Sequence, residues 1–313
     1  MTDFQALPLG IDIGSARTRV ALTTRDGQGR ASLVAVAVRP STEDPATAII
    51  EAIRELETKE RRCVFGVSPP DGILRMMTFP PMRNRERERA ARFEATRFID
   101  YSLHDAAVRV DAIESAGRNF AVGILRKSVI ARYQAAAKAA QLQVLAIDDS
   151  GFALARVFPG SDAILDIGMT GSVLHLFGRR LPKTHRFTTG GRAFTDAIAS
   201  SLGIEFSEAE HRKTTIGIIG TGELLRDAFI DSIASEIIDF RAAGTGDVRS
   251  ITLVGNGARL PNLADDIEAA TAIPTTLAMF GPELSRTLPS DVLRAAAPDW
   301  SCAVGLSTWV LGE

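Results

Sequence analysis

The chain has 313 residues, of which 45% are hydrophobic and 24% are charged, and this length predicts more than one lobe around a sizeable core. A formal net charge of −2 and an aromatic content of 6% argue against a nucleic-acid-binding surface, which needs a basic face or base-stacking rings. The two cysteines form no CxxC pair and the four histidines show no zinc-ligand spacing, so we expect reduced thiols and no zinc site.

The N-terminal segment MTDFQALPLG has neither the basic region nor the apolar run of a signal peptide. No apolar stretch elsewhere is long enough to span a bilayer. We therefore expect a cytoplasmic protein whose association with a membrane, if any, passes through a partner.

Two stretches about half the chain apart share one local plan, in which a strand leads through an Asp-Ile-Gly turn into a second strand. The first is LGIDIGS at 9–15, followed by a strand at 19–23. The second is ILDIGMT at 164–170, followed by the strand SVLHLF at 172–177. Each is a hairpin with a carboxylate and a glycine at its tip, and the repetition predicts two similar lobes that face each other.

The rest of the chain alternates predicted strands and helices, which is typical of an α/β fold. In the first lobe, 1–158, we expect strands at 31–38, 62–67, 106–114, 119–125 and 144–147 and helices at 45–58, 84–99 and 149–158. The break Ser-Pro-Pro-Asp-Gly at 68–72 opens an inserted small subdomain over about 71–142. In the second lobe, 159–313, we expect helices at 191–202, 207–214, 220–240, 261–271 and 303–311, a strand at 250–254, and a small subdomain over about 203–245.

Two local features predict helix starts. Ser207 and Glu210 have the spacing of a capping box, and Asp148, Asp149 or Ser150 is expected to cap the helix at 149–158.

The paired turns contain the groups that a nucleotide site requires. Glycine turns let backbone N–H groups approach phosphate oxygens closely, and aspartates can hold a hydrated Mg²⁺. Taken singly, each turn is also explained as an ordinary β-turn. The sequence has no GxxxxGK[ST] motif, and GNGARL at 255–260 lacks the third glycine of a dinucleotide-binding loop.

Five segments, in the same order along the chain, resemble the PilM-type actin-like ATPases of type IV pilus assembly. They are GIDIGSARTRVAL, ERERAARFEATRFIDYSLHDAAVRVD, TTGGRAFTDAIASSLGIEFSEAEHRKTT, VGNGARLPNLADDIEAATAIP and AVGLSTW. The second of these resembles the inserted subdomain that PilM shares with the cell-division protein FtsA. The resemblance implies an actin-like (FtsA/PilM-like) two-lobed ATPase fold with an inserted small α+β subdomain in the first lobe.

The resemblance also implies the residues that would bind ATP and Mg²⁺. Asp12 and Asp166 would hold Mg²⁺ through water. The remaining nucleotide-binding residues would be Gly14, Ser15, Arg19, Gly168, Thr170, Gly190, Gly191, Glu210, Lys213, Gly255, Asn256 and Gly257. Arg19 stands where the family often has lysine, and Asn256 where a middle glycine is common. Asp148 is the candidate to orient an attacking water, although a helix cap explains it as well.

The implied function is a cytoplasmic ATP-binding scaffold, at most a weak ATPase, at the inner face of the inner membrane. Its partner would be the N-terminal cytoplasmic tail of an inner-membrane pilus protein of the PilN type, and a homo-oligomer or ring is a further expectation.

Three alternatives remain open: a small-molecule kinase of the same superfold with Asp148 or Asp149 as base, an FtsA-like polymerising protein, and the cytoplasmic part of a type II secretion protein. The FtsA-like alternative is disfavoured because the sequence as given shows no basic amphipathic membrane helix.

The helix at 84–99 is rich in arginine, which is typical either of a solvated face or of a partner-binding one.

Overall fold

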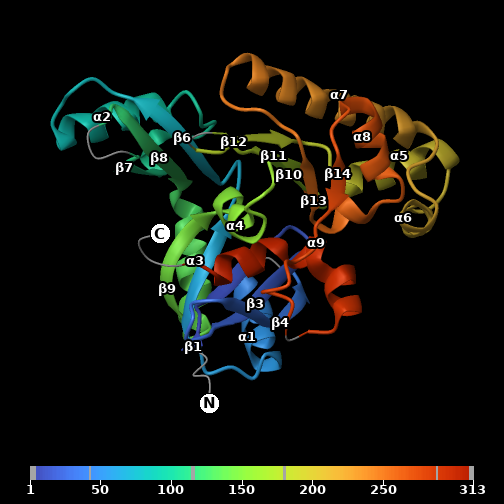
Figure 1. Cartoon of the computed structure of the whole chain (residues 1–313), viewed down its shortest axis with the longest axis horizontal. Coiled ribbons are helices and arrows are strands. Elements are labelled where there is room, and N and C mark those ends of the chain that lie inside the picture. Colours follow the sequence, from blue (N-terminus) through green and yellow to red (C-terminus); the bar gives the residue numbers. More distant parts are fainter. Residues whose placement is uncertain (1–4, 42–43, 114–116, 179–180, 287, 310–313) are drawn as a thin grey trace.

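The computed structural model describes residues 5–41, 44–113, 117–178, 181–286 and 288–309, and these residues form three sheets with flanking helices (Figure 1). The first sheet has the order β1-β3-β2-β5-β9, with β4 paired to β3. Its strands are β1 (Gln5–Ala6), β2 (Leu9–Ile13), β3 (Arg17–Arg25), β4 (Ala31–Pro40), β5 (Arg62–Val67) and β9 (Gln143–Asp149). The strands β2, β5 and β9 are parallel, and β3 runs antiparallel to β2, so the first Asp-Ile-Gly turn joins β2 to β3.

The second sheet has the order β12-β11-β10-β13-β14 and repeats the same plan. Its strands are β10 (Ala163–Ile167), β11 (Ser172–Leu176), β12 (Lys183–Phe187), β13 (Ile251–Val254) and β14 (Thr275–Leu277). The second Asp-Ile-Gly turn joins β10 to β11, and β13 lies parallel to β10 on its other side. The two turns therefore occupy equivalent positions in the two sheets.

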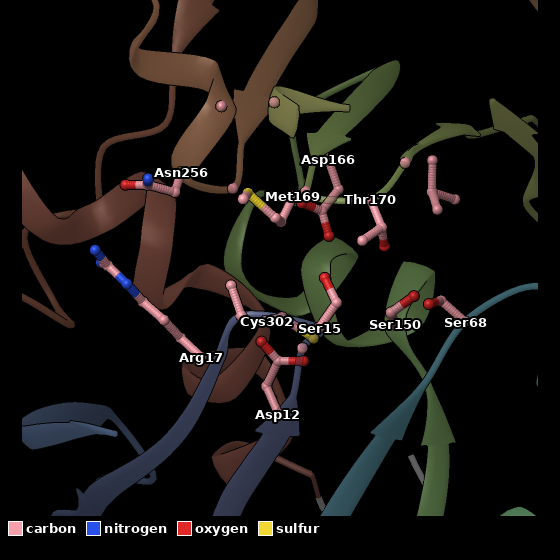
Figure 2. Close-up of a pocket in the computed structure, with 18 of the residues that line it drawn as sticks. Asp12, Ser15, Arg17, Ser68, Ser150, Asp166, Met169, Thr170, Asn256 and Cys302 are labelled. Carbon is pink, nitrogen blue, oxygen red and sulfur yellow. The ribbon is translucent and has the colours of Figure 1, made fainter. Parts of the chain in front are cut away.

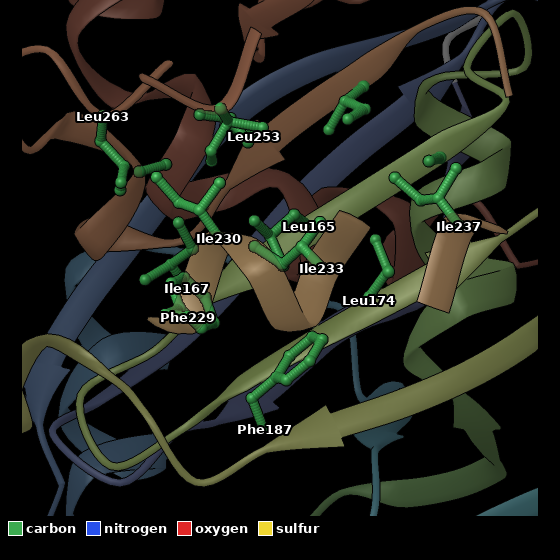
Figure 3. Packing of buried hydrophobic residues seen from close by; sticks show 14 of the residues in the cluster. Leu165, Ile167, Leu174, Phe187, Phe229, Ile230, Ile233, Ile237, Leu253 and Leu263 are labelled. Atoms are coloured by element: carbon green, nitrogen blue, oxygen red, sulfur yellow. The ribbon is translucent and has the colours of Figure 1, made fainter. Parts of the chain in front are cut away.

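Helices cover both large sheets because their apolar faces complete the two cores. The helices of the second part are α5 (Gly191–Leu202), α6 (Phe206–Thr215), α7 (Thr221–Ala242) and α8 (Leu263–Thr271). Ile230, Ile233 and Ile237 of α7 lie at helical spacing and pack on Leu165 and Leu174 of the second sheet (Figure 3). In the first part, α1 (Pro45–Glu55) and α3 (Lys127–Ala139) pack on the first sheet.

The third sheet is small and antiparallel, with the order β6-β8-β7, and lies to one side of the two large sheets (Figure 1). It consists of β6 (Gly72–Thr78), β7 (Ala106–Ala112) and β8 (Asn119–Arg126), and is accompanied by α2 (Asn84–Ala95) and the 3-10 turn Leu103–Asp105. It has its own core around Phe120, Val122 and Ile124. The helix α3 falls inside the range 71–142 assigned to the inserted subdomain, yet its buried residues Val129 and Tyr133 join the core of the first sheet.

Two helices lie at the centre of the molecule, α4 (Ser150–Val157) and α9 (Ser290–Ser307) (Figure 1). They touch at backbone distance, because a Cβ on Gly305 would lie 2.0 Å from the carbonyl oxygen of Ala153. Gly10 of β2 admits α9 in the same way, since a Cβ there would lie 2.0 Å from the carbonyl oxygen of Ala303. Because these positions are glycines, α9 packs directly against β2 of the first sheet and against α4, although it follows the second sheet in the sequence.

Several predicted boundaries differ from the structure for local physical reasons. The final helix starts at Ser290, whereas the sequence predicted its start at residue 303. The prediction was too late because Pro298, a residue that usually ends helices, lies inside α9. Helix α6 starts at Phe206 with Glu205 as its cap, so the predicted capping box at Ser207 and Glu210 is wrong. Residue 114 of the predicted strand and residues 310–311 of the predicted final helix lie outside the described residues.

Candidate functional site

A cavity of about 340 Å³ lies where the two Asp-Ile-Gly turns face each other. Figure 2 shows Asp12 and Ser15 on one side of it and Asp166, Met169 and Thr170 on the other. Of the residues that the resemblance implies, those lining the cavity are Asp12, Gly14, Ser15, Arg19, Asp166, Gly168, Thr170, Gly191, Glu210, Lys213, Gly255, Asn256 and Gly257. Segments that are far apart in sequence thus converge on one hollow of suitable size for a small ligand.

Arg19 links the first turn to the central helix α9. Its guanidinium donates to Asp12 at 3.2 Å and to Asp299 at 2.5 Å, and both Arg19 and Asp299 are nearly buried. Burial raises the pKa of the Asp12 carboxyl, while the adjacent Arg19 charge acts in the opposite direction. The carboxylates of Asp12 and Asp299 hold Arg19 in its charged form and fix the orientation of its guanidinium.

Asp166 occupies the equivalent place in the second sheet. Burial, reinforced by the charge of Asp12, raises the pKa of the Asp166 carboxyl to about 6. Within the described residues, Asp166 has no hydrogen-bond or ion-pair partner, in contrast to Asp12. A divalent cation or a proton would offset the cost of this partly buried charge.

The second turn and the glycine pair before α5 are packed so closely that side chains would not fit. A Cβ on Gly190 would lie 2.4 Å from the backbone nitrogen of Gly171 and 2.8 Å from the carbonyl oxygen of Gly168. Gly190 itself is not a lining residue, unlike Gly191, whose N–H donates to the carbonyl of Gly168 at 2.9 Å. Gly190 therefore shapes the wall of the cavity from behind.

Lys213 is buried and all three of its ammonium protons have acceptors. They are the carbonyl oxygen of Gly191 at 2.8 Å, Thr195 Oγ1 at 2.7 Å and Glu210 Oε2 at 2.6 Å. Lys213 thus holds the start of α5 in place and has no donor left for a ligand. Glu210 is half-exposed at the cavity, and its Oε2 atom accepts from both Lys213 and Thr195.

The loop after β13 approaches Asp166 and the strand that precedes it. Gly255 has a φ of +82°, and a Cβ there would lie 2.4 Å from Asp166 Oδ1. A Cβ on Gly257 would lie 2.4 Å from Ile167 Cγ2, so this glycine is required for packing between protein segments. Asn256, between these two glycines, has an exposed side chain and also lines the cavity.

Asp148 lies at the end of β9 and is not among the residues that line the cavity. Its carboxylate pairs with Arg156 and also accepts the N–H of Asp149 at 3.0 Å. Asp149 is the cap of α4, where it accepts from Gly151 N at 2.9 Å and Phe152 N at 3.4 Å. Burial and the neighbouring charge of Asp148 raise the pKa of Asp149 to about 6. Both carboxylates therefore have structural roles, Asp149 as the cap of α4 and Asp148 as the partner of Arg156.

Several lining residues have no counterpart in the sequence prediction. Additional residues at the cavity include Arg17, Ser68, Arg132, Ser150, Met169, Arg186, Asp299 and Cys302. Asp299 is the most consequential, since it orients Arg19 from 280 positions away in the chain. In the sequence, Asp299 is marked only by its position next to Pro298 at the start of the apolar stretch WSCAVGL.

The donors at the cavity fit a hydrated magnesium ion better than a directly ligated metal. In the described part of the chain, no group of three His, Cys, Asp or Glu side chains converges as a metal site. Asp12 and Asp166 nevertheless face the same space, and Mg²⁺ typically keeps most of its waters when one or two carboxylates and a phosphate hold it.

Residues 10–308 match the family model described as type IV pilus assembly protein PilM. The chain belongs to this family. Among curated proteins, none matches the sequence significantly. This PilM-family chain is similar to a solved structure titled "PilM-PilN type IV pilus biogenesis complex", with a TM-score of 0.82, 23% identity, and 96% of this chain and 97% of that chain covered.

More distant structural relatives show the same fold. The ethanolamine utilization protein EutJ from Carboxydothermus hydrogenoformans matches with a TM-score of 0.57 and 15% identity, over 97% of this chain and 90% of that one. The activator of 2-hydroxyisocaproyl-CoA dehydratase from Clostridium difficile, solved with ADPNP, matches with a TM-score of 0.51 and 13% identity, over 98% and 93%. The PilM-family chain has the actin-like fold that the sequence predicted. None of its helices within the described residues is long and apolar enough to cross a membrane.

Proposed function

We propose that this protein is a cytoplasmic ATP-binding scaffold of type IV pilus assembly, with Mg²⁺-ATP bound between its two Asp-Ile-Gly turns. The observation that supports this most is the convergence of both turns, Arg19 and the Asn256 loop on one cavity. The two turns supply glycine-lined backbone next to carboxylates, which is the combination that phosphates and a hydrated cation require.

In this proposal each part of the cavity has one task. The Gly14 and Gly168 turns approach the phosphates from opposite sides, and Arg19, held by Asp299, supplies a fixed positive charge. Asp12 and Asp166 would hold Mg²⁺ through water, and the ion would neutralise phosphate charge when bound. Glu210 accepts from a ribose hydroxyl, while Asn256 meets the adenosine.

The site favours a binding protein over a small-molecule kinase of the same superfold. The two carboxylates considered as a kinase base are Asp148, which is paired with Arg156, and Asp149, which caps α4. Of the described carboxylates that line the cavity, Asp12 and Asp299 pair with Arg19, Glu210 with Lys213 and Asp71 with Arg126, and the remaining one, Asp166, is assigned to the cation in this proposal. A general base must be free to accept a proton from its nucleophile, so any hydrolysis is expected to be slow.

The partner in this proposal is the cytoplasmic N-terminal tail of an inner-membrane pilus protein of the PilN type. The support is family membership together with the structural match, whose title names a PilM-PilN complex. Through this tail the protein would be placed at the inner face of the inner membrane.

The partner prediction is tested by titrating a synthetic tail peptide from the neighbouring pilus membrane protein into this chain by calorimetry. We expect a dissociation constant on the order of micromolar, because ordering a flexible tail offsets part of its contact energy. If ATP alters the peptide affinity, the peptide must alter the ATP affinity by the same factor.

The control is a scrambled peptide of the same composition, which should not bind. Absence of binding by the native tail, combined with rapid phosphoryl transfer to a small metabolite, would replace the scaffold with the kinase. Peptide binding that ATP does not affect would support the scaffold and show that nucleotide binding is not coupled to tail binding.

A further inference from the structure

Arg186 lies in one row with Asp166 across the second sheet. Asp166 pairs with Val173 between β10 and β11, and Val173 pairs with Arg186 between β11 and β12. Directly paired residues on neighbouring strands point to the same face of a sheet. All three residues line the cavity, so this row forms part of its wall.

The guanidinium of Arg186 lies beside the turn that follows Asp166. Its Nη2 atom would be 3.4 Å from a Cβ on Gly171, which is an ordinary contact distance, so the guanidinium lies next to the Gly171 backbone. Over the described residues, Arg186 has no hydrogen-bond or ion-pair partner, whereas Arg17 and Arg19 pair with Asp299. Arg186 is thus an exposed cation at the cavity with its donors available.

The order of strands gives the cavity a direction. The Asn256 loop follows β13, Asp166 ends β10, and Arg186 is on β12, so the sheet order β13-β10-β11-β12 places Arg186 on the far side of Asp166 from Asn256. Neighbouring strands are about 4.8 Å apart. A nucleotide with its adenosine at Asn256 and its phosphates at the Asp166 turn therefore points its terminal phosphate toward Arg186.

We propose that Arg186 binds the terminal phosphate of ATP and makes this site discriminate ATP from ADP. The inference rests on the proposed nucleotide site and adds a specificity-determining residue from the outer strand of the second sheet. Arginine suits this role because its planar fork forms two parallel hydrogen bonds to a phosphate group. Since ADP lacks the terminal phosphate, only the triphosphate would gain these bonds.

The experiment measures the affinities of Mg²⁺-AMPPNP and Mg²⁺-ADP by calorimetry for the full chain and for Arg186→Gln. We expect Arg186→Gln to weaken AMPPNP binding about tenfold, equivalent to about 1.4 kcal/mol, and to leave ADP binding within about twofold. Arg186→Lys keeps the charge and loses the fork, so it should fall between the wild type and Arg186→Gln.

The matched control is Lys183→Gln on the same strand, because Lys183 is an exposed cation that pairs with Glu236 and does not line the cavity. It should leave both affinities unchanged, and melting without ligand checks that each variant is folded. Equal weakening of AMPPNP and ADP, or no change in either, would overturn the assignment of Arg186. Failure of the wild type to bind either nucleotide would instead overturn the nucleotide site itself, and the assignment with it.

Discussion

Replacing Gly305 with alanine is expected to destabilise the protein by about 3 kcal/mol or more, the upper range for overpacking a close contact. The added methyl group would lie 2.0 Å from the carbonyl oxygen of Ala153 and 2.5 Å from its carbonyl carbon. These are backbone atoms of α4, which cannot move aside as a flexible side chain can. The variant must therefore separate the two central helices α4 and α9.

Chemical denaturation of Gly305→Ala, monitored by circular dichroism, measures this effect. Gly123→Ala is the matched control, because a Cβ on Gly123 of β8 would meet no atom within 4 Å. We expect the control to unfold close to the wild type. A Gly305→Ala midpoint equal to that of Gly123→Ala would show that the α4–α9 contact is looser than the backbone distances indicate.

Replacing Asp166 with asparagine is expected to remove the Mg²⁺-dependent part of ATP binding and, without ligand, to stabilise the protein at neutral pH. Asparagine keeps the shape but cannot bring a charge to the hydrated ion. The stabilisation arises because burial raises the pKa of Asp166 to about 6, so its ionised form is disfavoured in the folded state. From an ordinary value of 3.8, this corresponds to at most about 3 kcal/mol at pH 7.

The pH dependence of this difference follows from the direction of the shift. Because the folded protein binds the Asp166 proton more tightly than the unfolded chain, the stability from this group is fully present below about pH 4 and is lost as the pH rises through about 6. Asp166→Asn should therefore melt above the wild type at pH 7 and converge with it near pH 4. The exposed Asp111→Asn is the control and should show neither effect. A variant that melts lower at pH 7, or that retains the Mg²⁺ dependence of the wild type, would contradict this role.

The two turns could be predicted from sequence because their signal is local. Strand, Asp-Ile-Gly and strand follow one another within about fifteen residues at 9–23 and again at 164–177, and the structure places both turns at the same cavity. Repetition of this local pattern at about half the chain length predicts two related sheets.

The partners of these turns could not be predicted, because they depend on tertiary packing. Asp299 reaches Arg19 only after α9 packs between the sheets, and Pro298 beside it obscured the helix in the sequence. The strand β12 has only five residues, two of which are the cations Lys183 and Arg186, so neither the strand nor the cavity position of Arg186 was expected. Lys213 matched a family motif, yet the structure shows that its donors serve the protein.

The central claim is that the cavity between the Asp12 and Asp166 turns binds Mg²⁺-ATP, and calorimetric titration of ATP into the full chain tests it most directly. The titration is run with Mg²⁺ and again with a chelator in its place. We predict one nucleotide per chain, with clearly tighter binding when Mg²⁺ is present, because two carboxylates face the phosphates and need a cation between them. No heat of binding in either condition, with the protein shown to be folded by its melting transition, would contradict the account.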